Sequence, residues 1–163
     1  MRITSLMCVL TAGAITTGCA EKFTPPDDSM DHIQVVMSNN WESVYHMVWR
    51  IQADDMVFLI HEEAAKGMDT HKMAHVAGAY ADTLAYMQEN NFAELPKMCD
   101  AIPEGDRNTI TDLPQENIAL VQQDTQTSAT PGCAGAVGLP PRYDQVYEAI
   151  RVAIQGTVEN GVE

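Results

Sequence analysis

The spacing of apolar residues over residues 31–91 constrains the fold more than any other feature of the chain. Plotted at 100° per residue, the apolar side chains of its first half gather on one side, as in an amphipathic helix. A second run, from about Thr70 to Asn91, follows the same period. Residues 66–69 separate the two runs, and Gly67 is suited to end a helix. We therefore predict two long helices that lie antiparallel across this turn. The apolar side of the first helix carries Ile33, Met37, Val44, Met47, Val48, Ile51, Phe58 and Leu59, together with Asn40.

Two shorter helices are expected in the second half of the chain. One runs from Leu113 to about Gln126 behind a capping Asp112, and the other from Arg142 to about Val158 behind two prolines. No segment alternates apolar and polar residues convincingly enough to predict a strand. The sequence therefore predicts an all-α fold, a small helical bundle built on a long antiparallel helix hairpin that the two shorter helices cover.

The length and charge of the chain limit its partners. With 163 residues, 45% of them hydrophobic and 20% charged, it has the size of one globular domain. Its formal net charge is −14, and it holds only nine lysine and arginine residues. Binding to a phosphate backbone requires clustered basic side chains, so we expect no nucleic-acid partner.

The N-terminus has the form of an export signal. Arg2 is followed by residues 3–17 without a charge, a run shorter than the roughly 20 residues of a membrane span. Residues 16–20 read Thr-Thr-Gly-Cys-Ala and resemble the lipobox of bacterial lipoproteins, with Thr16 where leucine is usual. The resemblance covers the first 20 residues only.

This resemblance implies cleavage after Gly18 and a diacylglycerol on the thiol of Cys19, with a further acyl group on the freed amine. Two or three acyl chains anchor a protein durably to a bilayer. Ala20 after the cysteine is typical of lipoproteins that are sorted to the outer membrane, where the host has one. The expected organisation is a removed signal peptide (1–18), a lipidated N-terminus with a proline-containing spacer that separates the domain from the membrane (19–30), and a helical domain (31–163).

If Cys8 is removed and Cys19 is lipidated, Cys99 and Cys133 are the two remaining thiols. Disulfides persist in exported proteins, so we predict a Cys99–Cys133 disulfide. Closing a loop of about 34 residues would stabilise the fold by roughly 3 to 4 kcal/mol in the chain-entropy model.

Histidines and methionines gather around the expected turn. Two histidines four residues apart on a helix, such as His71 and His75, can bind one metal ion, and His61 and Met68 could complete a copper-type site. The alternative is that these histidines form a solvated polar face. Lys72 stands where a zinc protease motif needs its glutamate, so that class is excluded.

Two carboxylates interrupt the apolar side of the first expected helix. Asp55 and Glu62 lie seven residues apart, and an unpaired charge buried there would be costly. Either this side becomes solvated toward the turn, with Lys66 near Glu62, or the carboxylates hold a cation or a proton inside the bundle. A di-iron pattern of glutamate followed three residues later by histidine is absent from the sequence.

Three functions remain open from the sequence. The favoured one is a membrane-tethered, non-catalytic module that binds or scaffolds another envelope protein, because no set of nucleophile, base and cofactor ligands is complete. The second is a metal-binding lipoprotein that uses the turn histidines. The third is an envelope enzyme with its site around Asp55 and Glu62.

Overall fold

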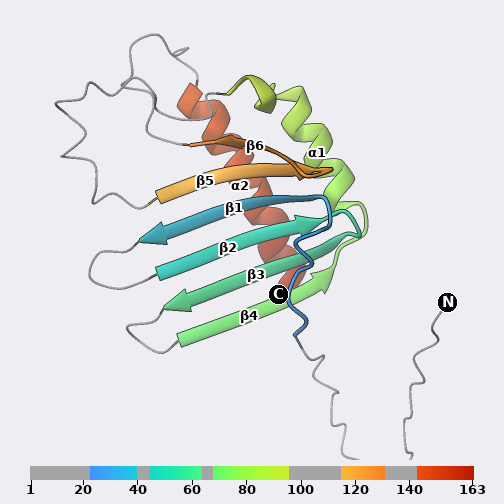
Figure 1. The fold of residues 1–163 in the computed structure, drawn as a ribbon, viewed down its shortest axis with the longest axis vertical. Coiled ribbons are helices and arrows are strands. Elements are labelled where there is room, and N and C mark those ends of the chain that lie inside the picture. The colour runs from blue at the N-terminus through green and yellow to red at the C-terminus, as the bar shows by residue number, and fades with distance from the viewer. Residues whose placement is uncertain (1–22, 40–44, 64–67, 96–114, 131–142) are drawn as a thin grey trace, which may run out of the picture.

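The fold is an antiparallel sheet with two helices, so the prediction of an all-α helical bundle is wrong. The computed structural model describes residues 23–39, 45–63, 68–95, 115–130 and 143–163. In chain order the elements are β1 (His32–Asn39), β2 (Tyr45–Gln52), β3 (Met56–Glu63), β4 (Met68–His75), α1 (Ala79–Glu89), η1 (Phe92–Glu94), β5 (Gln115–Gln122), β6 (Thr125–Ala129) and α2 (Tyr143–Val162) (Figure 1).

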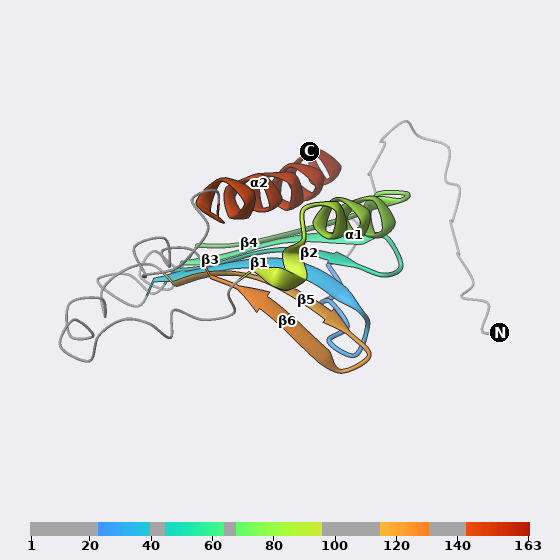
Figure 2. The ribbon, with the colours of Figure 1, turned by 90° about the horizontal axis from the view of Figure 1, so that it is seen from above.

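The six strands lie in the order β4-β3-β2-β1-β5-β6, and every neighbouring pair is antiparallel. Strands β1 to β4 form a meander, and the chain returns after α1 to add β5 on the other side of β1. Both helices lie on the same face of the sheet (Figure 2), which we call the helix face, and the opposite face we call the second face. Among the described residues, neither helix combines the length and the apolar character needed to cross a membrane.

The expected first helix is replaced by strands β1, β2 and β3 because its key spacing fits both structures. Ile33 and Met37 are four residues apart, which places them together on a helix but also on one face of a strand. The residues between them decide the outcome. Val35 and Val36 are β-branched, and this type of residue favours strands. Ile33, Val35 and Met37 then face the helices together.

The two described hairpin turns, between β2 and β3 and between β5 and β6, are short and lack the usual glycine. Between β2 and β3 the amide of Asp55 donates to the carbonyl of Gln52 at 2.9 Å, and Asp55 adopts a left-handed φ of 64°. Between β5 and β6, Gln123 and Asp124 have φ values of 47° and 64°, as in a type I′ hairpin turn. The predicted helix over residues 113–126 is therefore wrong, since a β-hairpin occupies most of that segment.

The other helix predictions have mixed outcomes. The expected helix from Thr70 to Asn91 is half wrong, since β4 occupies its start and α1 its second half. The final helix is confirmed and extends to Val162. Its apolar stripe is buried against the sheet, with Tyr147, Ile150, Ile154 and Val158 all between 0% and 2% exposed.

The core lies between the helices and the helix face of the sheet. The ring of Trp49 is buried in this core. Its indole N–H donates a hydrogen bond to Glu159 Oε1 of α2 at 2.8 Å. Near the end of α2, a Cβ added to Gly161 would lie 2.5 Å from Val76 Cγ2, so only glycine permits this close approach. The sheet contributes Ile33, Val35, Trp49, Ile51, Val57, Ile118 and Ala129 to this core.

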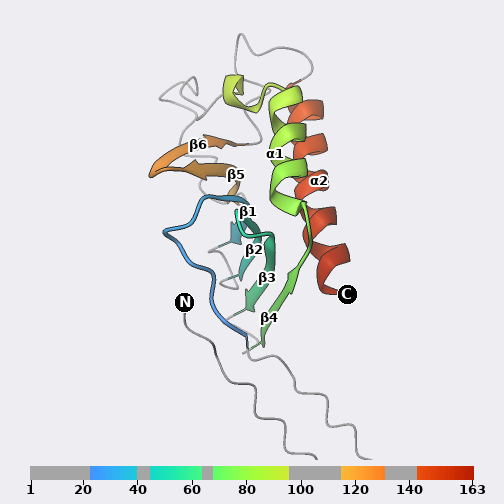
Figure 3. The same cartoon turned by 90° about the vertical axis from the view of Figure 1, so that its right-hand side faces the viewer.

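Residues 23–31 cross the second face, away from both helices (Figure 3). The segment begins over β3 and β4, where the ring of Phe23 lies 6.3 Å from that of Phe58 and 4.9 Å from that of His71. It ends beside the β5–β6 turn, where Asp31 Oδ1 accepts from the amide of Gln123 at 2.9 Å. The greater part of the expected spacer therefore lies against the domain.

Below this segment the second face buries His32, Arg50 and Gln52, which together with the exposed Asp28 form what we call the polar cluster. His32 and Arg50 are 4% and 6% exposed. His32 Nδ1 lies 2.7 Å from the carbonyl of Met30, so it carries the proton, and Nε2 accepts from Arg50 Nη2 at 2.7 Å. Arg50 Nη1 also donates to Asp28 at 2.7 Å. The second face therefore combines this hydrogen-bonded cluster with a few buried apolar residues, such as Val48 and Phe58, whereas the helix face is held mainly by apolar contacts.

Candidate functional site

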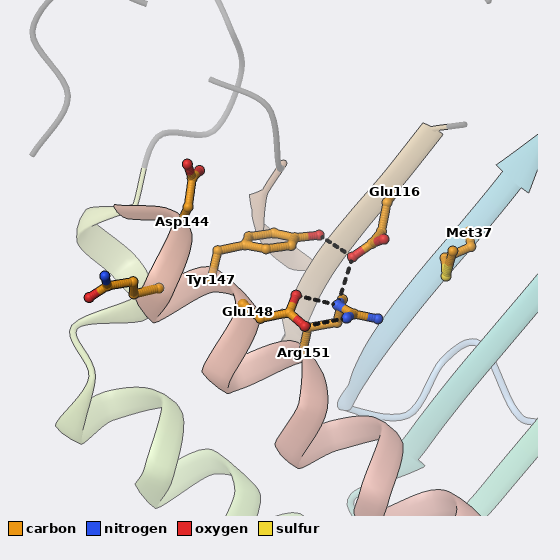
Figure 4. A pocket seen from close by; sticks show the side chains of 7 residues that line it. Met37, Glu116, Asp144, Tyr147, Glu148 and Arg151 are labelled. Carbon is orange, nitrogen blue, oxygen red and sulfur yellow. Dashed lines mark hydrogen bonds and ion pairs between the residues drawn. The ribbon is translucent and has the colours of Figure 1, made fainter. Parts of the chain in front are cut away.

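A pocket lies where the first turns of α2 pass the ends of β1 and β5 (Figure 4). It encloses about 710 Å³ and opens broadly to solvent. Met37 and Glu116 are direct partners across β1 and β5, so the sheet register places them side by side on the helix face. The described lining residues are Met37, Glu116, Asp144, Gln145, Tyr147, Glu148 and Arg151.

Arg151 is the centre of the pocket. Its Nε donates to Glu148 at 2.8 Å and lies 3.4 Å from Glu116 Oε1, and its Nη2 forms a second, close bond with Glu148. Its Nη1 donates to Gln155 at 2.9 Å, which is one turn further along α2. The guanidinium is thereby fixed between a carboxylate of the helix and a carboxylate of the sheet.

Tyr147 and Arg151 hold Glu116 from one side. The hydroxyl of Tyr147 donates to Glu116 Oε1 at 3.1 Å, and Tyr147 itself is only 2% exposed. The helical spacing of four residues places Tyr147 and Arg151 on the same side of α2. Glu116 therefore joins β5 to α2 through two polar contacts at the edge of the core.

The ionisation of these groups favours binding over proton transfer. The hydrogen bonds from Arg151 lower the pKa of Glu148, and the same bonds raise the pKa of Arg151. Both groups therefore stay charged near neutral pH, which makes them poor general acids or bases. The described lining residues include no serine, cysteine or lysine that could act as a nucleophile.

The pocket carries an excess of negative charge. It contains three carboxylates, Glu116, Asp144 and Glu148, and one cation, Arg151, so the difference is 3 − 1 = 2 negative charges. Met37 adds an apolar patch. Because the whole chain has a formal charge of −14, the surrounding potential also attracts cations. This arrangement suits a ligand that combines a positive charge with an apolar portion.

The histidines and methionine proposed for a metal site lie on strands. His71 and His75 are on the second face of β4, about 13 Å apart along the strand, whereas His61 on β3 points to the helix face. Met68 is the first residue of β4. The reason for expecting shared ligation, a helical spacing of four, is therefore wrong. Within the described ranges, no group of three or more His, Cys, Asp or Glu side chains is placed to hold a metal ion.

The two carboxylates of the enzyme hypothesis have separate structural roles. Asp55 accepts from the amides of Gly78 at 2.8 Å and Tyr80 at 3.1 Å, and these bonds lower its pKa and cap the start of α1. Glu62 is exposed and lies 3.2 Å from His71. Seven residues of extended chain separate the two carboxylates by about 23 Å, so they cannot act on one substrate.

Three predicted positions lie outside the described residues. Cys19 falls within residues 1–22, and Cys99 and Cys133 fall within residues 96–114 and 131–142. The lipid attachment and the disulfide therefore stay predictions.

Sequence reasoning missed most of the pocket. The final helix was predicted without a polar role for Tyr147, and Glu116 lies in a segment for which a helix was predicted that does not form. One signal was available, since Glu148 and Arg151 are three residues apart and of opposite charge on a confirmed helix. The contribution of β5 required the tertiary structure.

No protein-family model matches the chain, and a search of curated proteins finds no significant match.

Proposed function

We propose that this protein is a lipid-anchored, non-catalytic binding module of the bacterial cell envelope. The lipobox-like residues 16–20 support the anchoring, and Ala20 supports the outer membrane where the host has one. The observation that carries the binding role is the pocket at α2, in which both glutamates are tied to Arg151. Its ligand is a basic segment of an envelope protein.

The anchor is tested by mass spectrometry of the N-terminal peptide from the membrane fraction. We expect a diacylglycerol-modified Cys19 with an acylated amine, and a membrane-bound protein. Cys19→Ala should abolish the modification and keep the leader uncleaved. An unmodified Cys19 in the wild-type chain would contradict the anchoring.

Binding is tested by capture from detergent-solubilised envelopes with the full-length protein. Glu148 is 55% exposed at its side chain, so Glu148→Lys reverses a charge at the pocket without disturbing the core. We expect this variant to lose a basic partner that the wild-type protein retains. The matched control is Glu163→Lys, which makes the same charge change one residue beyond the end of α2, about 22 Å from Glu148 along the helix axis. Equal loss in both variants would show a general charge effect and contradict the pocket as the binding site.

A further inference from the structure

The second face of the sheet restricts how the domain can sit on a membrane. Residues 23–31 are attached to it at several separated places. The ring of Phe23 packs against β3 and β4, and the amide of Thr24 lies 3.4 Å from Met73 Sδ. Further along, Gln52 donates to the carbonyl of Asp27 at 2.6 Å, and Arg50 binds Asp28.

The attachment shortens the tether. If Cys19 carries the lipid, four Cα steps separate it from Phe23, and a fully extended chain covers them in about 14 Å. A spacer that was free up to His32 would have thirteen steps and reach about 47 Å. The docked segment therefore brings the domain several times closer to the bilayer than the length of the spacer suggests.

The place where the tether leaves the sheet sets the orientation. Phe23 contacts residues of β3 and β4, at one side of the sheet. The pocket is lined by β1, β5 and α2, on the opposite face, and β5 lies four strand spacings from β4, or about 19 Å across the sheet. The anchor and the pocket are therefore separated both along the sheet and through it.

We propose that the β3–β4 side of the sheet rests against the bilayer that holds the Cys19 lipid, and that the pocket is directed to the aqueous compartment. This inference rests on the proposed lipid anchor. Its occupant is the membrane itself, because a tether of about 14 Å leaves no room for a globular partner between the bilayer and this part of the second face. A basic ligand can then reach the pocket without passing between the domain and the lipid.

The test places a photoreactive benzophenone amino acid at Asp69 or, in a second protein, at Val152. Asp69 is exposed on the second face of β4, two residues from His71, and Val152 is 52% exposed on α2. The full-length lipidated protein is reconstituted into vesicles of phosphatidylethanolamine and phosphatidylglycerol and irradiated. We expect phospholipid adducts at Asp69 on the order of tenfold above those at Val152, as quantified by peptide mass spectrometry. Equal yields, or a higher yield at Val152, would overturn the orientation.

A second variant tests the role of the docked tether. Ten glycine and serine residues inserted between Lys22 and Phe23 add a flexible segment with an r.m.s. end-to-end distance of about 16 to 19 Å. Adducts at Asp69 should then fall toward the level of Val152, and an unchanged ratio would overturn the role of the short tether. The mass of the N-terminal peptide is measured in the same samples. An unlipidated Cys19 contradicts both the proposed anchor and this orientation, whereas a lipidated Cys19 with equal adducts contradicts only the orientation.

Discussion

The two faces of the sheet are built from the same strands but are stabilised by different interactions. The helix face carries Ile33, Val35 and Ile51, which are 0% exposed under α2 and its neighbours. The second face carries His32, Arg50 and Gln52 on the same two strands, and these are 2% to 6% exposed. At these six positions burial is nearly equal, yet apolar groups exclude water on the helix face and a hydrogen-bonded cluster excludes it on the second face.

Successive residues of a strand point to opposite faces, so the same strands can contribute apolar burial on one face and polar hydrogen bonds on the other. Apolar burial on the helix face does not depend on the protonation of any side chain. The polar cluster depends on a neutral His32 and a charged Arg50, and on a segment that contributes no strand. The helix face should therefore respond to changes in volume, and the second face to changes in charge and pH.

The largest expected effect is on the helix face. Ile33→Ala removes a side chain that is 0% exposed and should lower the free energy of unfolding by about 2 to 5 kcal/mol. Chemical denaturation of the full-length protein in detergent measures it at pH 7.5 and pH 5.5. The loss should be the same at both values, and a strongly pH-dependent loss would contradict the apolar character of this face. Ile33→Val is the control, with an expected loss of about 0.5 to 1.5 kcal/mol.

Arg50→Met should have the next largest effect and tests the polar cluster. The substitution keeps much of the volume but leaves His32 Nε2 and Asp28 without their shared donor. We expect the free energy of unfolding to fall by about 1.5 to 3 kcal/mol, the range for hydrogen bonds to charged groups. Increased proteolysis within residues 23–31 should accompany the loss. A stable variant with an intact N-terminal segment would show that the cluster does not hold it.

A pair of glycines in α2 tests how closely the helix must approach the sheet. Gly161→Ala would place Cβ 2.5 Å from Val76 Cγ2 and 3.1 Å from Val57 Cγ2, and should destabilise by about 1 to 3 kcal/mol. Gly156 has no neighbouring atom within 4 Å of an added Cβ, so Gly156→Ala should stabilise by about 0.5 to 1 kcal/mol through helix propensity. Thermal unfolding of both variants gives the comparison, and shifts of the same sign would contradict this packing.

The smallest expected effect is a pH dependence of the second face. Burial lowers the pKa of His32 below its usual 6.5, against opposing contributions from the Met30 carbonyl and from Asp28 and Asp31. The unfolded chain therefore takes up a proton at a higher pH than the folded chain does. The stability that His32 contributes is complete above pH 6.5 and is lost as the pH falls through its lower folded pKa.

This pH dependence is measured as the difference in unfolding free energy between the wild-type protein and His32→Gln at pH 7.5 and at pH 5.5. The stability of the wild-type protein relative to His32→Gln should be lower at pH 5.5 than at pH 7.5. A difference that does not change with pH would show that His32 is not held neutral.

The elements differ in how clearly their residue patterns predict them. The final helix was predictable because its stripe of Tyr147, Ile150 and Ile154 follows a helical period for several turns without a competing strand pattern. The structure of residues 31–63 was not predictable in this way, since apolar residues four positions apart fit both the period of a helix and the period of a strand. The missed signals were local, namely the β-branched and aromatic residues in β1 to β3 and the adjacent aspartates Asp54 and Asp55 at the β2–β3 turn.

The sequence alone established the acidic charge, the final amphipathic helix and the lipobox-like residues around Cys19, because each of these depends on composition or on neighbours close along the chain. Tertiary structure decided the rest. Pairing of β5 with β1 brings Glu116 to Arg151, and docking of residues 23–31 over the second face shortens the proposed tether. Both depend on contacts between residues far apart in the chain, and a local period carries no information about which strands become neighbours.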